Sequence, residues 1–484
     1  MIYLIPELSR ATGMTDEMRA NFRLMQEVSE YTRLNPANRV QSLNKFIKRI
    51  IETRDAKEVL DQWQVQLSQE LVRVSIRELP RETILFGSEH SEESNLKSEW
   101  SIRGRTSMYK AVDCRRWIML YPEKIERQSR NFLKTLIEAA QEMNYVIAEP
   151  LHKGVKSGRQ EEYTSIIEEM AEKKPNFVLC ILPTNRADRY SALKRLLIVK
   201  FGIPSQVIVE NRVLKHKNLR SICTKVAIQI NCKLGGIPWL IKMPVAGLMA
   251  VGFDVSYDPR NRKRSIGAMV ATMDVRVSSC FYSVTVQYKD GNEMVEKIDQ
   301  HMQKAIEFYK YAVGAFPERI VYYRDGIGDS QIQFVKRQEV EPIIKTLSQI
   351  YGSNPRFAFI VVNKRTNARF FKKQGNQFIN PQPGSIIDNG VTCKGRQDFY
   401  LISQHVGQGT VAPTYYNIIH NNTGLDIEKV ELLTYKLCHL YYNWGGTVRI
   451  PSICQNAKKL AFLTTQSLNG AIANEHLTKS LYFL

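Results

Sequence analysis

The sequence contains no pair of cysteines in a CxxC arrangement. Its 8 cysteines are scattered along 484 residues, which argues against a zinc ribbon or a disulfide framework and favours a reducing compartment. Cys438 and His439, together with Cys454, could be read as metal ligands. Because their spacing fits no ordinary zinc module, we favour packing in the core.

Other familiar patterns are also absent. Without the dinucleotide fingerprint GxGxxG, the sequence predicts no nicotinamide or flavin site. No apolar run reaches the ~18 to 20 residues of a membrane span, since the longest candidate, around 237–255, is broken by Lys242 and Pro244. The opening MIYLIPELSRATGM lacks the charged-then-apolar shape of a signal peptide. We find no basic amphipathic helix or lipidation motif that would favour a membrane surface as partner.

What the sequence has in excess is positive charge. There are 68 lysines and arginines against 48 aspartates and glutamates, a net charge of +20. An excess of this size indicates a polyanionic partner, and nucleic acid is the first candidate.

The first hundred residues read as polar and helical, with a helix start at Thr15 and apolar positions at helical spacing. The polar, turn-rich stretch 87–108 is predicted to be a linker or loop. We see no internal repeat and no low-complexity tract.

From residue 116 strands alternate with helices. The expected strands are 116–122, 175–183 and 205–209, and the expected helices are 129–144, 188–201 and 218–236. Alternation at this pitch predicts βαβ units and a parallel sheet, a Rossmann-like layout.

A second α/β region follows from residue 246. The expected strands are 247–257, 265–274, 279–288, 318–325, 357–364 and 398–405, and the expected helices are 292–313, 426–444 and 455–470. Three strands, a helix and further strands favour a mixed sheet with flanking helices.

Acidic residues occupy unusual positions in this second region. Asp254 lies inside an apolar strand, where aspartate is disfavoured, Asp325 ends another, and Glu293 precedes the long helix. A buried carboxylate is costly unless it is paired, hydrogen-bonded or bound to a metal. Two aspartates on strands of one sheet could hold magnesium for phosphoryl-transfer chemistry. The alternative is an ion pair with a nearby arginine, of which Arg324 is one.

Several motifs that occur in order favour the metal site over the ion pair. They are VGFDVSYDP, YYRDGIGDSQ, NKRTNARFF, NPQPGSIID, QGTVAPTYYNII, LTYKLCHLYYNW, RIPSICQNAKKLAFL and the ending LYFL. Over nearly the whole chain the sequence resembles the PIWI clade of the Argonaute family. The resemblance implies a helical post-PAZ linker and lead-in over 1–109, a Rossmann-like MID domain over 110–245 and an RNase H-like PIWI domain over 246–484. The family's N and PAZ domains are missing, so we expect a truncated form of a longer protein.

The resemblance also implies roles for the carboxylates. Asp254 and Asp325 match the metal-binding catalytic aspartates, and Glu293, 32 positions before Asp325, fits the family's mobile glutamate finger. The fourth position, usually His or Asp in cleaving members, is Lys458. A protonated lysine has no lone pair for magnesium or manganese, so we expect weak or no cleavage of target RNA. The nuclear transcriptional silencer of this clade also carries lysine here.

In the MID-like part the resemblance implies a pocket for the 5′ phosphate of a guide RNA, made by Tyr190, Lys194, Gln206, Gln229 and Lys233. Tyr190 and Lys194 are four residues apart, on one helix face. Tyr190 could stack on the first base, and the two lysines could meet the phosphate. A lone lysine is usually a solvated surface residue, but the ordered set favours the pocket.

In PIWI-clade members a magnesium ion joins this phosphate to the C-terminal carboxylate, here that of Leu484. Gln229 stands where other Argonautes have lysine, and the cation would replace the lost charge.

The expected function is therefore piRNA-guided silencing of transposons and genes in the germline. The expected partners are a small guide RNA (a piRNA), target RNA and protein silencing cofactors of the Tudor or zinc-finger type. We expect a monomer in the nucleus, with a cytoplasmic germ granule as the alternative compartment. Two other functions stay open: an active magnesium-dependent slicer, and an RNase H-like nuclease or transposase without a guide, against which the five-residue pocket argues.

Overall fold

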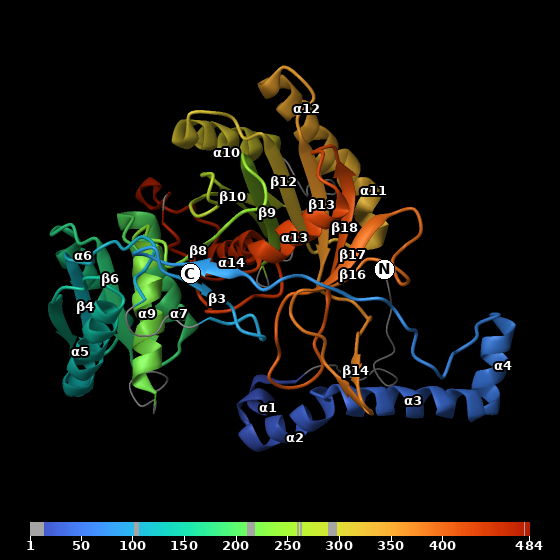
Figure 1. Cartoon of the computed structure of the whole chain (residues 1–484). Helices are drawn as coiled ribbons and strands as arrows, with labels where there is room; N and C mark the ends of the chain where they lie inside the picture. Colours follow the sequence, from blue (N-terminus) through green and yellow to red (C-terminus); the bar gives the residue numbers. More distant parts are fainter. Residues whose placement is uncertain are drawn as a thin grey trace. The chain divides into compact units, whose positions relative to one another are not determined.

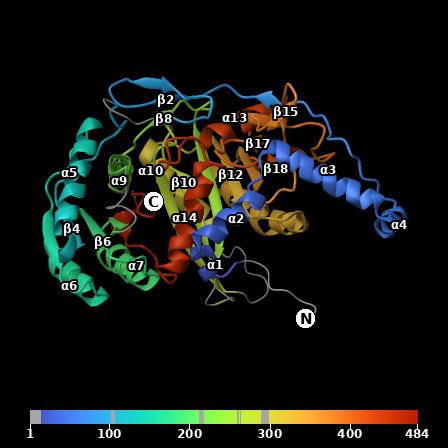
Figure 2. The same cartoon turned by 90° about the horizontal axis from the view of Figure 1, so that it is seen from below.

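The computed structural model describes residues 14–100, 106–210, 218–258, 261, 264–288, 298–478 and 480–484. The chain divides into two compact units. The first combines Met1–Arg73, Asn367–Pro381 and His405–Ala412, and the second contains the remainder. Figures 1 and 2 show their elements from two directions.

The first unit is built from four helices and a two-stranded hairpin: α1 (Asp16–Ala20), α2 (Phe22–Thr32), α3 (Pro36–Glu52), α4 (Arg54–Gln62), β14 (Lys372–Gln374) and β15 (Gln377–Ile379). The predicted helix start is confirmed, because Thr15 caps α1 and accepts a hydrogen bond from the Met18 amide. A second cap at Asn21 divides the expected helix in two. Gly409 belongs to the same unit, and the Asn380 side chain donates to its carbonyl at 3.0 Å.

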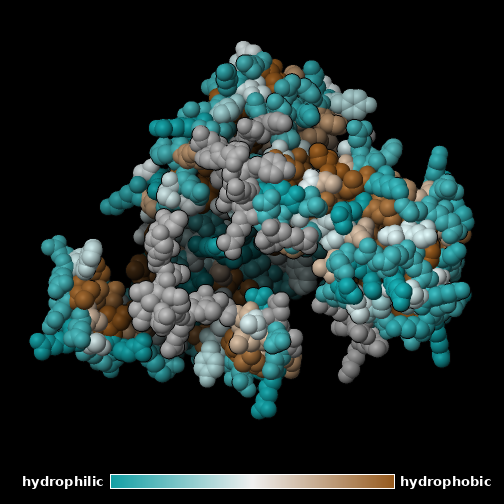
Figure 3. Space-filling view, turned by 180° about the vertical axis from the view of Figure 1, so that it is seen from behind, coloured by the Kyte–Doolittle hydropathy of each residue, from teal (hydrophilic) through white to brown (hydrophobic). Residues whose placement is uncertain are grey.

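The helices of the first unit leave large apolar side chains in contact with solvent, among them Phe22, Tyr31 and Trp63. Figure 3, viewed from behind, shows brown patches of hydrophobic residues within a largely hydrophilic surface.

The second unit contains a four-stranded sheet in the order β5-β4-β6-β7, formed by β4 (Trp117–Pro122), β5 (Leu151–Val155), β6 (Phe177–Leu182) and β7 (Ser205–Val209). All of its strand pairs are parallel, which confirms the Rossmann-like layout. The sheet is covered by α5 (Glu126–Glu142) and α9 (Leu219–Lys233) on one face and by α6 (Gln160–Ala171) and α7 (Ala187–Lys194) on the other. In Figure 2, α5 and α6 flank β4 and β6.

The second sheet has nine strands in the order β1-β16-β17-β18-β13-β12-β9-β10-β11. They are β1 (Arg77–Glu78), β9 (Leu248–Tyr257), β10 (Arg264–Thr272), β11 (Cys280–Tyr288), β12 (Arg319–Asp325), β13 (Phe357–Asn363), β16 (Ser385–Ile387), β17 (Gln397–Ile402) and β18 (Thr414–Asn421). Strand β12 is parallel to both of its neighbours, β9 and β13, and the other pairs are antiparallel. The predicted mixed sheet is therefore confirmed.

Helices cover both faces of the nine-stranded sheet, and the alternation along β9 decides which residue meets which helix. Met249 and Val251 join the core beneath α10 (Ile298–Val313) and α12 (Glu341–Tyr351), whereas Leu248 and Ala250 join the core beneath α13 (Ile427–Leu437) and α14 (Ser452–Gln466). Figure 1 shows these two helix layers. Short α11 (Ile332–Val335) follows β12 after a turn.

Three expectations about the secondary structure are wrong. Helical structure in the first hundred residues ends at Gln62, and the stretch predicted as a loop contains β3 (Ser91–Glu93), which pairs with β2 (Thr83–Leu85) and, through it, with β8 (Leu240–Ile241). Of the three residues of β2, Ile84 alone is fully buried. The alternation of buried and exposed residues that marks a strand is therefore too short here to be recognised in the sequence.

The helix expected over 426–444 ends at Leu437. The buried indole of Trp239 donates to the carbonyl of His439 at 2.9 Å, a carbonyl that the shorter helix leaves available. Strands β1, β5, β16 and β18 of the two large sheets were not expected. Among the described residues, no helix is both long and apolar enough to cross a membrane.

Strand β9 approaches α14 so closely that Gly252 has no room for a side chain. A Cβ there would lie 2.6 Å from the carbonyl carbon of Ile453 and 2.7 Å from the amide nitrogen of Cys454, both backbone atoms. We predict that Gly252→Ala destabilises the protein by about 1–3 kcal/mol through overpacking, seen as a lower midpoint of thermal unfolding. Gly328→Ala is the matched control, because its Cβ would meet nothing closer than 3.9 Å. Equal midpoints for both variants would contradict the close approach.

Candidate functional site

Two buried lysines meet at the start of strand β7. Lys194 is the last residue of α7 and Lys233 the last residue of α9, and their side chains are only 3% and 1% exposed. Both ammonium groups donate to the backbone carbonyl of Ser205 at 2.9 Å. Lys194 also donates to the Ser205 hydroxyl at 3.0 Å. A single carbonyl therefore holds two cationic groups close together.

Neither ammonium forms an ion pair with a carboxylate of the part of the chain that the structure describes. Burial lowers the pKa of Lys194 to about 8. Burial, and then the charge of Lys194, hold the pKa of Lys233 well below its usual range. Like charges that share a low-dielectric site repel each other, so an anion that bridged them would be strongly favoured.

Two further predicted pocket residues lie beside these lysines. Gln206 accepts a hydrogen bond from the Lys233 ammonium at 2.6 Å. The half-buried ring of Tyr190 lies 5.7 Å from the Lys194 ammonium, measured to the ring centroid. The structure thus brings together four of the five residues predicted to hold a phosphate.

The fifth, Gln229, contacts a residue that sequence reasoning missed. Its side-chain amide donates to the Asn443 side chain. Asn443 comes from the segment after α13, far away in sequence, so no local pattern could have identified it. Ser205 was also missed, because the atom that contacts both lysines is its backbone carbonyl oxygen, which carries no sequence signature.

The end of the chain lies against α9. The Leu481 amide donates to the Cys232 carbonyl at 3.4 Å, next to Lys233. Tyr482 and Phe483 are 3% and 5% exposed and pack edge-on against Tyr282. As expected from the apolar SLYFL ending, this segment packs inward, and Leu484 is partly buried against the main core.

Asp254 and Asp325 lie on neighbouring parallel strands. Arg324 of β12 is in register with Phe253 of β9, so the aspartates that follow them point to the same face of the sheet. Leu248, Ala250, Val321 and Tyr323 show which face it is, since all four belong to the core beneath α13 and α14. Asp325, at the end of the strand with the sequence YYRD, therefore lies beside Asp254 on one face of the sheet.

The surroundings of this pair fit a divalent cation. Asp325 is 1% exposed, and its Oδ1 is buried without a hydrogen-bond partner. Burial, and then the charge of Asp325, raise the pKa of Asp254 to about 6. An unpartnered carboxylate oxygen beside a second carboxylate that repels it is a suitable ligand for magnesium or manganese. Asp254 and Asp325 are the residues that would hold such an ion.

The cation that contacts Asp325 is Lys364, which sequence reasoning missed. Its ammonium forms an ion pair with Asp325 Oδ2. Lys364 directly follows β13, which pairs in parallel with β12. The carboxyl ends of the two strands therefore lie at the same edge of the sheet, and this was the signal in the sequence that could have identified Lys364. Lys458 is exposed on α14, one helical turn after the buried Cys454. Glu293 lies outside the described residues.

The two nearby arginines that the structure describes, Arg264 and Arg324, form no ion pair with Asp254 or Asp325. Arg324 is buried with Glu339, which accepts from its Nε at 3.0 Å, and its guanidinium lies 5.0 Å from the centre of the Phe253 ring on the other face. Arg264 pairs with Asp258. The ion pair that the sequence suggested for these aspartates therefore exists at Asp325, but with Lys364 and not with an arginine.

Cys438, His439 and Cys454 are fully buried, in agreement with core packing. Cys438 Sγ donates to the Thr434 carbonyl at 3.3 Å, and His439 Nδ1 lies 3.0 Å from the Tyr435 carbonyl. Burial lowers the pKa of His439 to about 4.

Comparison with known proteins identifies the family. Residues 177–469 match the family model described as the Piwi domain, and the sequence is 40% identical over 488 residues to Piwi-like protein Siwi of Bombyx mori. The chain belongs to the Piwi family. It is also 40% identical to Protein aubergine and 37% identical to Protein piwi, both of Drosophila melanogaster. All of this chain aligns in each case, but it spans only 54%, 56% and 57% of these relatives.

Solved structures give the fold of this Piwi-family chain. The crystal structure of Drosophila Piwi matches with a TM-score of 0.88 and 37% identity, over 99% of this chain and 65% of that one. Kluyveromyces polysporus Argonaute with a guide RNA matches with a TM-score of 0.80 at 18% identity, over 98% of this chain and 62% of that one, which shows the fold alone. The architecture is that of an Argonaute C-terminal lobe, a Rossmann-like MID domain and an RNase H-like PIWI domain. The domain boundaries stay predictions.

The raised pKa of Asp254 predicts a pH-dependent stability. A carboxyl whose pKa rises from 3.8 to about 6 on folding costs stability as the pH rises through that window, because the folded protein must then hold the charged form. In EDTA, Asp254→Asn should stabilise the protein by about 1 kcal/mol at pH 7.5 and change little near pH 4. Thermal unfolding at both pH values measures this, and a variant less stable than the parent at pH 7.5 would contradict the repulsion.

Proposed function

We propose that this chain is the guide-binding and target-pairing part of a Piwi-family silencing protein. It binds the 5′ phosphate of a small guide RNA, a piRNA, and pairs that guide with target RNA to silence transposons and genes. The observation that carries the proposal is the pair of buried lysines on the Ser205 carbonyl, which no described carboxylate neutralises. The net charge of +20 supports a polyanionic partner.

The pocket suits a terminal phosphate in particular. A terminal phosphate carries about two negative charges near pH 7 and three acceptor oxygens, which match the two ammonium donors. Each charge-assisted contact is worth roughly 1.5 to 3 kcal/mol. Tyr190, on the same helix as Lys194, provides an aromatic face on which a first base could stack. Kluyveromyces polysporus Argonaute, which has the same fold, was solved with a guide RNA.

We further propose that a magnesium ion joins this phosphate to the Leu484 carboxylate. The inward packing of the chain end beside α9 supports the idea. Gln229 is neutral, so a divalent cation would supply the positive charge that a lysine there would give.

For the carboxylate pair we propose a magnesium or manganese site with weak or no slicing. Asp254 and Asp325 fit such an ion. Slicing is disfavoured because Lys458 stands in place of a metal ligand and because the Lys364 ammonium already contacts Asp325. The second candidate function is an active piRNA-guided endoribonuclease, and the unpartnered Asp325 Oδ1 favours it.

A nuclear location, a monomeric state and silencing cofactors of the Tudor or zinc-finger type complete the proposal. They rest on the resemblance of the sequence to the PIWI clade.

The central test removes the two charges. Lys194→Met with Lys233→Met keeps buried apolar volume and should weaken binding of 5′-phosphorylated RNA by at least about 100-fold, since two charge-assisted contacts are lost. Binding of 5′-hydroxyl RNA should change little. Filter binding with both RNAs measures the difference, and Lys200→Met, which changes an exposed lysine paired with Glu168, is the control. A double variant that folds normally and still prefers the phosphorylated RNA would exclude this pocket.

The slicing status has its own test. Guide-loaded protein should cut a matched target weakly or not at all in magnesium or manganese, because a protonated lysine cannot act as a metal ligand. Lys458→His should raise the cleavage rate, and adding Asp325→Asn should abolish the gain. Robust magnesium-dependent cleavage by the unmutated protein would support the slicer instead.

A further inference from the structure

We propose that a second pocket binds a segment of a partner protein that carries an aromatic residue between lysines or arginines. The pocket has a volume of about 1070 Å³. Thr224, Lys225 and Ile228 line it from α9, ahead of Gln229 and Lys233 of the phosphate pocket along that helix. The two pockets adjoin at Asn443, which lines this one and accepts a hydrogen bond from Gln229. The proposal goes beyond guide binding and does not depend on it.

One wall of the pocket is aromatic. Trp100 and Tyr442 each pack edge-on against Trp239, with ring centroids 5.5 Å and 5.2 Å from that of Trp239. Met143 and Ile228 extend the apolar lining. Packed aromatic walls of this kind bind a flat apolar side chain by stacking and edge contacts.

The same wall carries polar atoms without partners. The Trp100 Nε1 and the Tyr442 hydroxyl are buried and form no hydrogen bond, and each side chain is only 6% exposed. Buried donors are normally satisfied. Both residues line the pocket, so main-chain carbonyls of a bound peptide are the natural acceptors.

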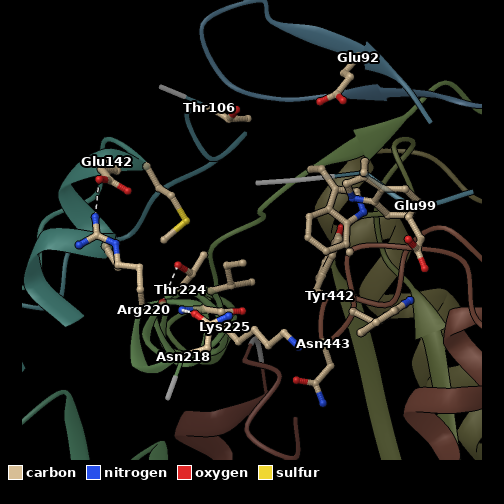
Figure 4. Close-up of a pocket in the computed structure, with 18 of the residues that line it drawn as sticks. Glu92, Glu99, Thr106, Glu142, Asn218, Arg220, Thr224, Lys225, Tyr442 and Asn443 are labelled. Atoms are coloured by element: carbon tan, nitrogen blue, oxygen red, sulfur yellow. Dashed lines mark hydrogen bonds and ion pairs between the residues drawn. The ribbon is translucent and has the colours of Figure 1, made fainter. Parts of the chain in front are cut away.

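The charges of the pocket select the ligand. Three carboxylates line it, those of Glu92, Glu99 and Glu142, against the two cations Arg220 and Lys225. Arg220 is already paired with Glu142 and Glu138. Figure 4 shows Glu142 and Arg220 on one side of the pocket, Tyr442 and Glu99 on the other, and Glu92 above them.

Apart from Arg220 and Glu142, the charged residues of the pocket are two glutamates, Glu92 and Glu99, and one lysine, Lys225. Glu92 and Glu99 form no ion pair with any residue that the structure describes. The Lys225 ammonium lies 5.2 Å from the centre of the Trp444 ring, over its face. In a chain with a net charge of +20, this acidic rim is the wrong sign for RNA and complements a basic peptide.

The experiment uses the whole chain and three fluorescein-labelled heptapeptides, each with a central triplet flanked by glycine and serine. The triplets are lysine–tryptophan–lysine, lysine–alanine–lysine and glutamate–tryptophan–glutamate. Fluorescence anisotropy should show the first peptide binding at least about fivefold more tightly than either of the others, as expected for an aromatic anchor with matched charge.

Two variants locate the binding. Glu92→Lys with Glu99→Lys should weaken the first peptide by about tenfold, whereas Glu161→Lys with Glu172→Lys, two exposed glutamates of the same unit, should leave it unchanged. Thr224→Trp should fill the pocket and abolish binding while the thermal midpoint is retained. Equal binding of all three peptides, no effect of the Glu92 and Glu99 reversals, or displacement of the peptide by 5′-hydroxyl oligouridine would each overturn the proposal.

Discussion

Two lysine ammonium groups donate to one backbone carbonyl, that of Ser205, inside the protein. Bringing two cations out of water and close together is unfavourable unless an anion offsets the cost. The parallel sheet and the ends of α7 and α9 hold this arrangement in place before any ligand arrives. A preorganised site of this kind loses little entropy on binding, which is the property that retention of a guide by one terminal phosphate requires.

At the carboxylate pair the buried like charges are negative instead of positive. Parallel pairing of β9 with β12 places Asp254 and Asp325 on one face, where they repel each other. Here the protein provides its own partial counter-ion, Lys364. The two sites therefore differ: no carboxylate among the described residues pairs with the two lysines, whereas Asp325 of the carboxylate pair already contacts a cation with which a metal must compete.

The sequence allowed much of this to be predicted. The alternation of apolar strands and amphipathic helices predicted the central strands of both large sheets but not β1, β5, β16 or β18. Ordered motifs predicted Tyr190, Lys194, Gln206 and Lys233 as neighbours. It did not reveal Ser205, Asn443 or Lys364. Ser205 contacts both lysines through its backbone carbonyl, and the other two come from distant segments that only the tertiary fold brings close. The short strands β2 and β3 were missed because they form only within a three-stranded sheet whose third strand, β8, is far away in sequence.

The central claim is that the buried lysines hold a terminal phosphate in their charged form. The most direct measurement is the ratio of affinities for 5′-phosphorylated and 5′-hydroxyl RNA between pH 7 and pH 9.5. Burial lowers the pKa of both lysines in the free protein, that of Lys194 to about 8, so binding the phosphate in their charged form must return protons to them at higher pH. The ratio should therefore fall above pH 8 by about tenfold for each pH unit and for each lysine that must regain its proton. A ratio that stays constant over this range would contradict the account.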